Sequence, residues 1–354
     1  MSFHSLSVEN VRSYDLYNAP LDAGITLIIG PNGSGKTTLL EALYYACRGT
    51  SFRGRDRDII AYNKKRALIK LTDIKGEERR ARLWVDSEKM QKEFIVQQKK
   101  TARLTQPQKI PVVLFEPDEL RLLTSSPKRR RDFFDGIIAR LSPTYQTVYN
   151  RYARTLLQRN ELLKKQKDFS PDAWNNHLFA WDVKFAELAQ KIAVHRHEFI
   201  ALSNKKISTL YSSLAKHTHT IHAEYKSTIS SKNYNQSLLH ALYRNRHSDA
   251  VRGYTSVGPH RDDIGVYLDA HLASETASRG EMRTIMLAYK LLEVILQTNI
   301  HDTTPLILMD DVFSELDITR EKQLMQALKK YQTIITATDL RDEMKVSASV
   351  INLS

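Results

Sequence analysis

The chain has 354 residues and carries 53 Lys and Arg residues against 40 Asp and Glu residues, a formal net charge of +13. This charge favours a polyanionic partner, either nucleic acid or an anionic membrane surface. The single cysteine, Cys47, excludes an internal disulfide, and no stretch reaches the roughly 18 apolar residues of a membrane span. The N-terminus MSFHSLSVENV lacks the pattern of a secretory leader. We therefore expect a soluble, cytoplasmic protein with no membrane partner.

The first motif along the chain is GPNGSGKT at residues 30–37, which fits the phosphate-binding pattern G-x-x-x-x-G-K-[ST]. An apolar run precedes it and helix-forming residues follow, the strand–loop–helix context that this loop requires. Lys36 is expected to reach the β- and γ-phosphates, and the Thr37 hydroxyl to ligate Mg²⁺. The predicted ATP contacts of the loop are Gly30, Pro31, Asn32, Gly33, Ser34, Gly35, Lys36, Thr37 and Thr38.

The residues after the loop change from strand to helix periodicity. Residues 67–96 alternate apolar and polar positions around a Lys-Gly turn at 75–76, which predicts antiparallel strands. The run at 110–115 predicts a further strand. Ser142-Pro143 and Ser170-Pro171 then begin two long helical runs. The polar turn KKQKDFS joins these runs, so they predict an antiparallel arm about 40 Å long.

Two charged or polar clusters follow in the chain. Lys128, Arg129, Arg130 and Arg131 lie at the base of the arm and form either a solvated helix face or a DNA-binding surface that follows phosphates. Ser278-Arg279-Gly280 precedes an amphipathic helix. Its N-terminus either binds an anion and completes the site of another molecule or simply begins a core helix.

The last chemical element is PLILMDD at residues 305–311, an apolar run that ends in two aspartates. It predicts a buried parallel strand whose carboxyl end lies where α/β sheets bind ligands. Asp310 is expected to hold Mg²⁺ through water, and Asp311 to orient or activate the attacking water. Asp310, Asp311 and Lys36 are the predicted catalytic residues, with Thr37 and Asp310 at the metal.

These elements, together with SELD at 314–317, resemble the ATPase head of ABC-type proteins. Within that group the chain is similar, almost end to end, to the RecF family of bacterial recombination ATPases. The resemblance rests on LSVENVRSYD, VVLFEPDELRLLTSSPKRRRDFFD, GPHRDD at 258–263, SRGEMRTIMLAYKL and MDDVFSELD. We therefore predict an α/β fold, an ABC-type P-loop ATPase head with a mixed sheet and helices, plus a helical lobe with a short antiparallel coiled-coil arm. The expected parts are residues 1–125 and 246–354 for the two halves of the head and 126–245 for the lobe.

The resemblance implies an ATP-dependent homodimer in which each ATP lies between one P-loop and the partner copy's signature residues, Ser278, Arg279 and Gly280. Ser314 and Asp317 would communicate across this dimer. Closure would clamp duplex or gapped DNA, and slow ATP hydrolysis would release it. The family works with RecO and RecR to load RecA, in DNA replication, recombination, repair and the SOS response.

The chain departs from related ATPases at two points. Glu281 follows the signature where many heads have Gln, which puts an extra negative charge near a phosphate site. Thr336 and Thr338 stand after the last strand where transporter heads have a switch histidine. Both features suit a slow switch. The alternatives are a nuclease or defence ATPase with the same head, and a transporter subunit.

Two histidine clusters complete the candidates. His217, His219 and His222 in HTHTIH have the density of a metal site, although solvated side chains are the simpler interpretation. His260 in GPHRDD follows a Gly-Pro turn, and we expect it to brace the two lobes.

Overall fold

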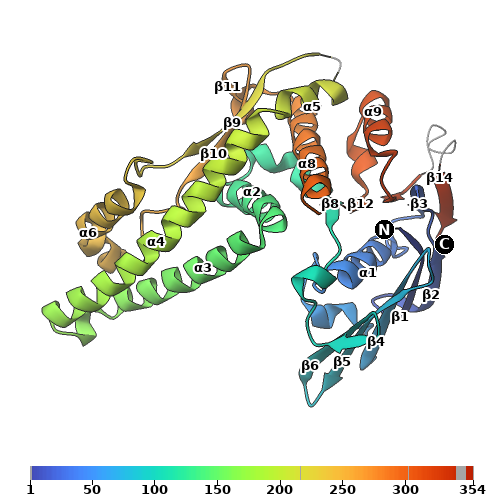
Figure 1. The fold of residues 1–354 in the computed structure, drawn as a ribbon, viewed down its shortest axis with the longest axis horizontal. Helices are drawn as coiled ribbons and strands as arrows, with labels where there is room; N and C mark the ends of the chain where they lie inside the picture. The colour runs from blue at the N-terminus through green and yellow to red at the C-terminus, as the bar shows by residue number, and fades with distance from the viewer. Residues whose placement is uncertain (1, 216, 302, 340–347, 354) are drawn as a thin grey trace. The chain divides into compact units, whose positions relative to one another are not determined.

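The computed structural model describes residues 2–215, 217–301, 303–339 and 348–353. The chain divides into two compact units (Figure 1). The first comprises Met1–Leu120, Ser213–Ala215 and Lys290–Ser354, and the second comprises Arg121–Ser212 and Lys216–Tyr289. The first boundary lies five residues before the expected one. Residues 246–289, which we expected in the head, belong to the second unit.

A parallel sheet of five strands forms the centre of the first unit, in the order β14-β3-β13-β12-β8. All the residues of β3 and β13 are buried, which explains their continuous apolar character. Since the strands are parallel, their carboxyl ends share one edge, and Asp310 closes β12 at this edge. The bounds are β3 Ile25–Ile29, β8 Val112–Phe115, β12 Leu306–Asp310, β13 Thr333–Ala337 and β14 Ala348–Asn352.

A second sheet of the first unit is antiparallel, in the order β2-β1-β4-β5-β6-β7, and confirms the strands expected at 67–96. Gly76 adopts a left-handed φ of +81° in the turn between β4 and β5. Helix α1, Lys36–Arg48, packs on strands of both sheets, and its apolar side chains join their core. The bounds are β1 Phe3–Val11, β2 Tyr14–Pro20, β4 Arg66–Asp73, β5 Glu78–Asp86, β6 Lys89–Val96 and β7 Lys99–Thr101.

Shorter helical elements complete the chain around these strands. The first unit holds the 3-10 helices η1 Asp56–Ile59, η2 Gln106–Gln108 and η5 Val312–Glu315 and helix α9 Ile318–Leu328. The 3-10 helix η3 Pro117–Thr124, which follows β8, and helix α5 Ile207–Leu214 each span a boundary between the two units. Helix α8, Arg279–His301, begins in the second unit and continues in the first from Lys290. Among the described residues, none of the helices combines the length and apolar character needed to cross a membrane.

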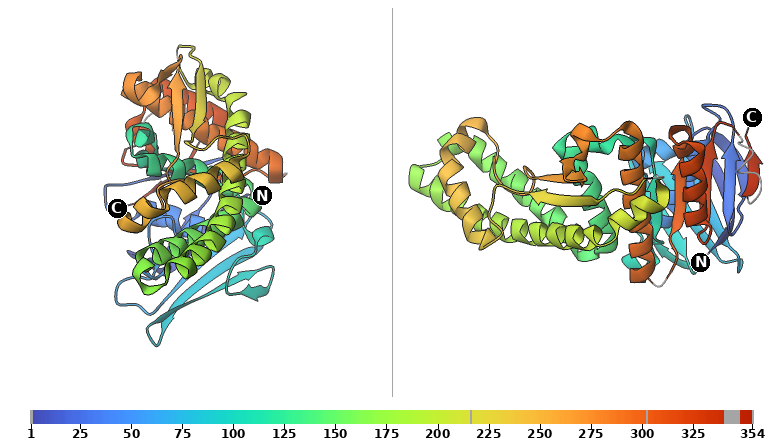
Figure 2. Two further views of the ribbon diagram at one scale, coloured as in Figure 1. Left: turned by 90° about the vertical axis from the view of Figure 1, so that its left-hand side faces the viewer. Right: turned by 90° about the horizontal axis from the view of Figure 1, so that it is seen from above.

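The second unit contains the expected arm, an antiparallel hairpin of α3 and α4 (Figures 1 and 2). Ser142 and Ser170 cap the two helices by accepting hydrogen bonds from the N–H groups of Tyr145 and Ala173. At 22 and 34 residues, the helices extend for about 33 and 51 Å. The elements of this unit are α2 Pro127–Leu141, α3 Pro143–Lys164, η4 Gln166–Asp168, α4 Pro171–Asn204, β9 Ile221–Lys226, α6 Tyr234–Arg252, β10 Asp263–Leu268, β11 His271–Leu272 and α7 Ala273–Thr276.

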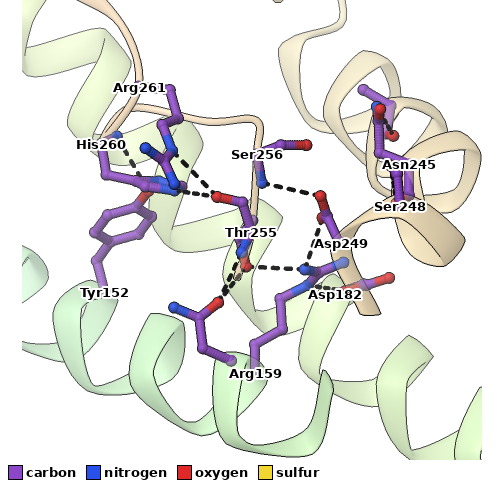
Figure 3. A network of polar contacts seen from close by, with 12 residues as sticks. Tyr152, Arg159, Asp182, Asn245, Ser248, Asp249, Thr255, Ser256, His260 and Arg261 are labelled. Carbon is purple, nitrogen blue, oxygen red and sulfur yellow. Dashed lines mark hydrogen bonds and ion pairs between the residues drawn. The ribbon is translucent and has the colours of Figure 1, made fainter. Parts of the chain in front are cut away.

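A buried polar network joins α3, α4, α6 and the following loop (Figure 3). The Arg159 guanidinium, fully buried, donates to Asp182 at 2.6 Å, to Asp249 at 3.2 Å and to the Thr255 hydroxyl at 2.8 Å. Two buried carboxylates thus pair with one buried cation, as charges in a core require, although Arg159 Nη2 has no hydrogen-bond partner among the described residues. This network fixes the end of α6 to the arm.

His260 extends the same network, and its tautomer follows from its partners. Its Nε2 lies 3.0 Å from the Thr255 carbonyl oxygen, which can only accept, so Nε2 carries the proton. Its Nδ1 then accepts from the Tyr152 hydroxyl at 2.6 Å. Burial lowers the pKa of His260 to about 4, so the ring is neutral at physiological pH. These partners lie in the second unit, so His260 braces that unit internally, which corrects the expected role between the lobes.

Candidate ATP site

The P-loop connects β3 to α1 and turns sharply at two glycines. Gly33 and Gly35 have left-handed φ values of +87° and +92°. A Cβ at Gly35 would lie 2.6 Å from the Tyr14 hydroxyl oxygen, so only glycine fits there. The Tyr14 hydroxyl in turn donates to the Ser34 carbonyl at 3.1 Å. Tyr14 therefore holds the loop from the antiparallel sheet, a contact that the motif alone did not reveal.

The Lys36 side chain curls back over the loop. Its ammonium is buried and donates to the carbonyl oxygens of Gly30 at 2.7 Å and Pro31 at 2.9 Å. The Ser34 hydroxyl is also buried and has no hydrogen-bond partner among the described residues. A buried cation and an orphaned donor at a helix N-terminus are groups that a phosphate would satisfy. The loop thus fits the triphosphate predicted from its sequence.

Asp310 lies where the expected metal site requires a carboxylate. Its Oδ1 accepts from the Thr37 hydroxyl at 2.8 Å and from the Thr336 hydroxyl at 2.9 Å. These three residues come from α1, β12 and β13, and the parallel ladders bring them to one edge of the sheet. A hydroxyl and a carboxylate are oxygen ligands of the kind that Mg²⁺ prefers, so the donor set fits this ion.

Asp311 follows with an unusual backbone, a left-handed φ of +50°. Its N–H donates to the Thr336 hydroxyl at 3.0 Å, and its carbonyl accepts from the Ser314 hydroxyl at 2.6 Å. A non-glycine residue in this conformation stores strain that the surroundings must hold. Burial raises the pKa of Asp311, although Ser314 and Lys36 act in the opposite direction.

A cavity of about 420 Å³ combines these groups. Ser13, Arg53 and Pro117 also line it and were not predicted; Arg53 adds a second cation to the site. A wider cavity of about 1160 Å³ adjoins it, because Ser13 and Thr38 line both. The other lining residues of the smaller cavity are Asn32, Gly33, Gly35, Lys36, Thr37, Thr38, Asp310 and Asp311.

Glu116 directly follows strand β8 and precedes Pro117, which lines this cavity. Burial, followed by the neighbouring Glu119 carboxylate, raises the pKa of Glu116 to about 7. Lys290 opposes this shift and forms an ion pair with Glu119 at 3.2 Å. Perturbed acids concentrate at functional sites, so Glu116 becomes an additional candidate.

The signature residues lie at the start of α8 in the second unit, with Ser278 and Arg279 exposed. Glu281 turns back on them: its Oε2 accepts from the Ser278 N–H at 2.7 Å, while the Glu281 N–H donates to the Ser278 hydroxyl at 3.3 Å. This is a capping box. Gly280 accepts from the Thr284 hydroxyl at 2.8 Å within the first turn.

His219 of the HTHTIH segment approaches the same helix end. Its Nδ1 lies 2.5 Å from Asp269 Oδ2, and its Nε2 lies 3.8 Å from Glu281 Oε1. His222 instead stacks on the Tyr267 ring, with centroids 4.8 Å apart. The two side chains therefore serve separate contacts within the second unit.

Ser314 and Asp317 surround the start of α9 and are both exposed. Asp317 is the N-cap of this helix, where it accepts from the Arg320 N–H at 2.9 Å and also forms an ion pair with the Arg320 side chain. The segment between the metal carboxylate and α9 is thus fixed at both ends.

The basic cluster at 128–131 divides into two pairs. Arg130 donates to Asp263 at 3.0 Å, and Arg131 donates to the Asp262 carbonyl, so both reach into the GPHRDD segment. Lys128 and Arg129 are exposed. Lys128 also pairs with Asp132 at 2.9 Å on the same helix, so three of the four residues have contacts inside the second unit.

Comparison with known proteins gives one consistent result. Residues 2–352 match the RecF/RecN/SMC N-terminal domain family. DNA replication and repair protein RecF of Clostridium perfringens (strain SM101 / Type A) is 31% identical over 348 residues, covering 97% of this chain and 94% of the relative. RecF of Streptococcus pyogenes serotype M49 (strain NZ131) is also 31% identical, over 96% of this chain and 93% of its own length.

The fold leads to the same group. Two solved structures of the recombination mediator protein RecF in the RecFOR pathway, one with ATP and one with ATPrS, superpose with TM-scores of 0.81 and 0.83. Each is 25% identical and covers 96% of this chain and 93% of its own. These findings confirm the predicted family and fold class and support ATP binding and hydrolysis. The chain therefore belongs to the RecF/RecN/SMC N-terminal domain family, in which its relatives are RecF proteins.

Proposed function

We propose that the chain is a slow ATPase that acts in DNA replication and repair by closing as an ATP-dependent homodimer on DNA. The observation that carries this proposal is the complementarity of two separate features. Lys36, Thr37 and Asp310 form a phosphate and metal site, and Ser278 and Arg279 present an exposed helix N-terminus that a second copy's nucleotide would satisfy.

The residues of the site have distinct roles in this proposal. The Lys36 ammonium exchanges its carbonyl partners for the β- and γ-phosphates, and Thr37 and Asp310 hold Mg²⁺. When bound, the ion neutralises charge that develops on the phosphates. Asp311 orients the attacking water, and its raised pKa suits a group that accepts a proton. Ser314 and Asp317 are placed to respond to the nucleotide of the partner copy.

The cellular role follows from the relatives. Proteins named for DNA replication and repair share almost the whole length of this chain, and the RecF structures are described within the RecFOR pathway. We infer that this chain likewise binds duplex or gapped DNA and acts with RecO and RecR. The net charge of +13 is consistent with a polyanionic partner.

Light scattering on the full chain tests the dimer, with and without ATP and gapped duplex DNA. We expect an ATP-dependent dimer that DNA stabilises. Lys36→Ala should abolish ATP binding, Ser278→Arg should bind ATP but stay monomeric, and Asp311→Asn should bind ATP and remain dimeric. A chain that stays monomeric with ATP and DNA would refute an ATP site shared between two copies. A Ser278→Arg variant that dimerises normally would show that the signature residues are not part of this site.

A further inference from the structure

Helix α6 of the second unit has one buried face and one exposed face of unusual composition. Leu238, Ala241 and Leu242 are buried, and the helix packs on α3 and α4 of the arm (Figures 1 and 2). On the opposite side, side chains three and four positions apart share one face of the helix. The members of this face are His240, Tyr243, Arg244, Arg246, His247 and Val251.

Acidic side chains are missing from this part of the sequence. Residues 226–261 contain six Lys and Arg residues and a single acid, Asp249. Asp249 is fully buried and pairs with Arg159, so it does not offset the surface charge (Figure 3). An ordinary solvated helix face mixes both signs of charge. The exposed face of α6 instead carries positively charged side chains and no acidic ones.

Aromatic rings accompany the charge. Tyr243 is 61% exposed, and the Arg246 guanidinium lies over its ring, 4.2 Å from the centroid. Tyr254, just beyond the helix, is 42% exposed, with Arg261 over its ring at 4.7 Å. Aromatic side chains exposed to this degree contribute little to the hydrophobic core of the chain. Arginine and tyrosine together form the kind of surface that binds phosphates and stacks with unpaired bases.

We propose that the exposed face of α6, together with Tyr254 and Arg261, binds a single-stranded segment of DNA. This inference rests on the DNA-binding function proposed above and locates a contact surface for it. Arg244 and Arg246 of this face contact the phosphates, together with Arg252, an exposed residue at the C-terminal end of α6, while Tyr243 offers its ring to an unpaired base. The exposed rings favour single strands over duplex, because bases in a duplex are already stacked on each other.

This surface differs from the one that the sequence suggests at residues 128–131. Arg130 of that cluster forms an ion pair with Asp263, and Arg131 donates to the Asp262 carbonyl, so both guanidinium groups are hydrogen-bonded within the unit. On α6, in contrast, Arg244 and Arg252 are exposed, and the one acid of the helix is committed to Arg159. The Arg246 guanidinium lies over the Tyr243 ring.

The test measures the affinity of the full chain, with ATP, for a fluorescent single-stranded oligonucleotide across a range of salt concentrations. Replacing Arg244, Arg246 and Arg252 by Gln should weaken binding by about 10-fold or more near 0.1 M salt. It should also reduce the slope of log K against log salt by about 2, as expected for three lost phosphate contacts. The matched control replaces Lys191, Lys205 and Lys206, exposed residues of the same unit, by Gln and removes the same net charge.

Tyr243 supplies the second measurement. Tyr243→Ser should weaken binding to the single strand by roughly 10-fold and leave binding to a blunt duplex unchanged, whereas Tyr243→Phe keeps the ring and should bind normally. If the arginine variant and the lysine control lose the same affinity, only net charge matters, and the proposal that the α6 surface binds the single strand is wrong. A wild-type chain that binds no DNA would overturn the proposed function itself.

Discussion

Thr336 offers the clearest single test of how the proposed metal site is built. Its buried hydroxyl donates to Asp310 Oδ1 at 2.9 Å and accepts from the Asp311 N–H at 3.0 Å, so it ties together both acids of the motif. Thr336→Val keeps the shape and removes both bonds. A partly buried N–H left without a partner costs about 1–3 kcal/mol. We expect the free energy of unfolding to fall by about this amount.

The functional effect should exceed the loss of stability. Without the Thr336 hydroxyl, the Asp310 carboxylate keeps the Thr37 contact and the strained backbone of Asp311 keeps the Ser314 contact, but each loses one of its hydrogen bonds. ATP hydrolysis should therefore fall by about 10-fold or more, while ATP binding without Mg²⁺ changes little. Thr336→Ser retains the hydroxyl and is the control. Urea unfolding and steady-state hydrolysis measure both effects, and equal activity of the Val and Ser variants would refute this account of the site.

Three further perturbations test other parts of the chain. Arg159→Met leaves Asp182 and Asp249 buried without their cation, so unfolding free energy should fall by about 3–5 kcal/mol near pH 7 in urea. The loss should shrink in acid, because protonation removes the uncompensated negative charge of the two buried carboxyl groups. The Glu116 carboxyl has a folded pKa of about 7, so the wild-type free energy of unfolding falls as the pH rises toward 7. Glu116→Gln removes this loss and should stabilise the chain by roughly 2–3 kcal/mol at pH 8, with no stabilisation below pH 4.5. Melting curves of the wild type and the variant across this pH range measure the difference. Gly35→Ala should reduce binding of a fluorescent ATP analogue by about 10-fold, because φ at this position is +92°.

The parts of the fold that the sequence predicted are those with local signals. The P-loop, the strand ending in Asp310 and the serine caps of the arm each combine periodicity with a turn or capping residue within about ten positions. The pairing of Thr37 with Asp310 could be predicted as well, because parallel strands necessarily bring their carboxyl ends to one edge. Such features do not depend on how distant segments pack.

The missed residues are those whose role depends on distant packing. Tyr14 contacts the P-loop from the other sheet, and Arg53 reaches the cavity from an irregular segment, so neither belongs to a local pattern. The contacts of the basic run at 128–131 depend on distant packing in the same way. Nothing near Arg130 in the sequence indicates that Asp263, 133 positions later, is its partner. The boundary of the units at Lys290 lies within a continuous helix, where the sequence carries no break.

The structure also bears on the extra charge at Glu281. A free carboxylate one turn into the signature helix would repel a phosphate at that helix end. Here the carboxylate accepts from the Ser278 N–H and lies near His219, whose other nitrogen contacts Asp269. The negative charge is therefore used to fix the first turn, while the Ser278 hydroxyl can still donate its own proton to a ligand. Glutamate at position 281 is thus compatible with a phosphate-binding signature. The Ser278 N–H, however, already donates to Glu281 and is not offered to the phosphate.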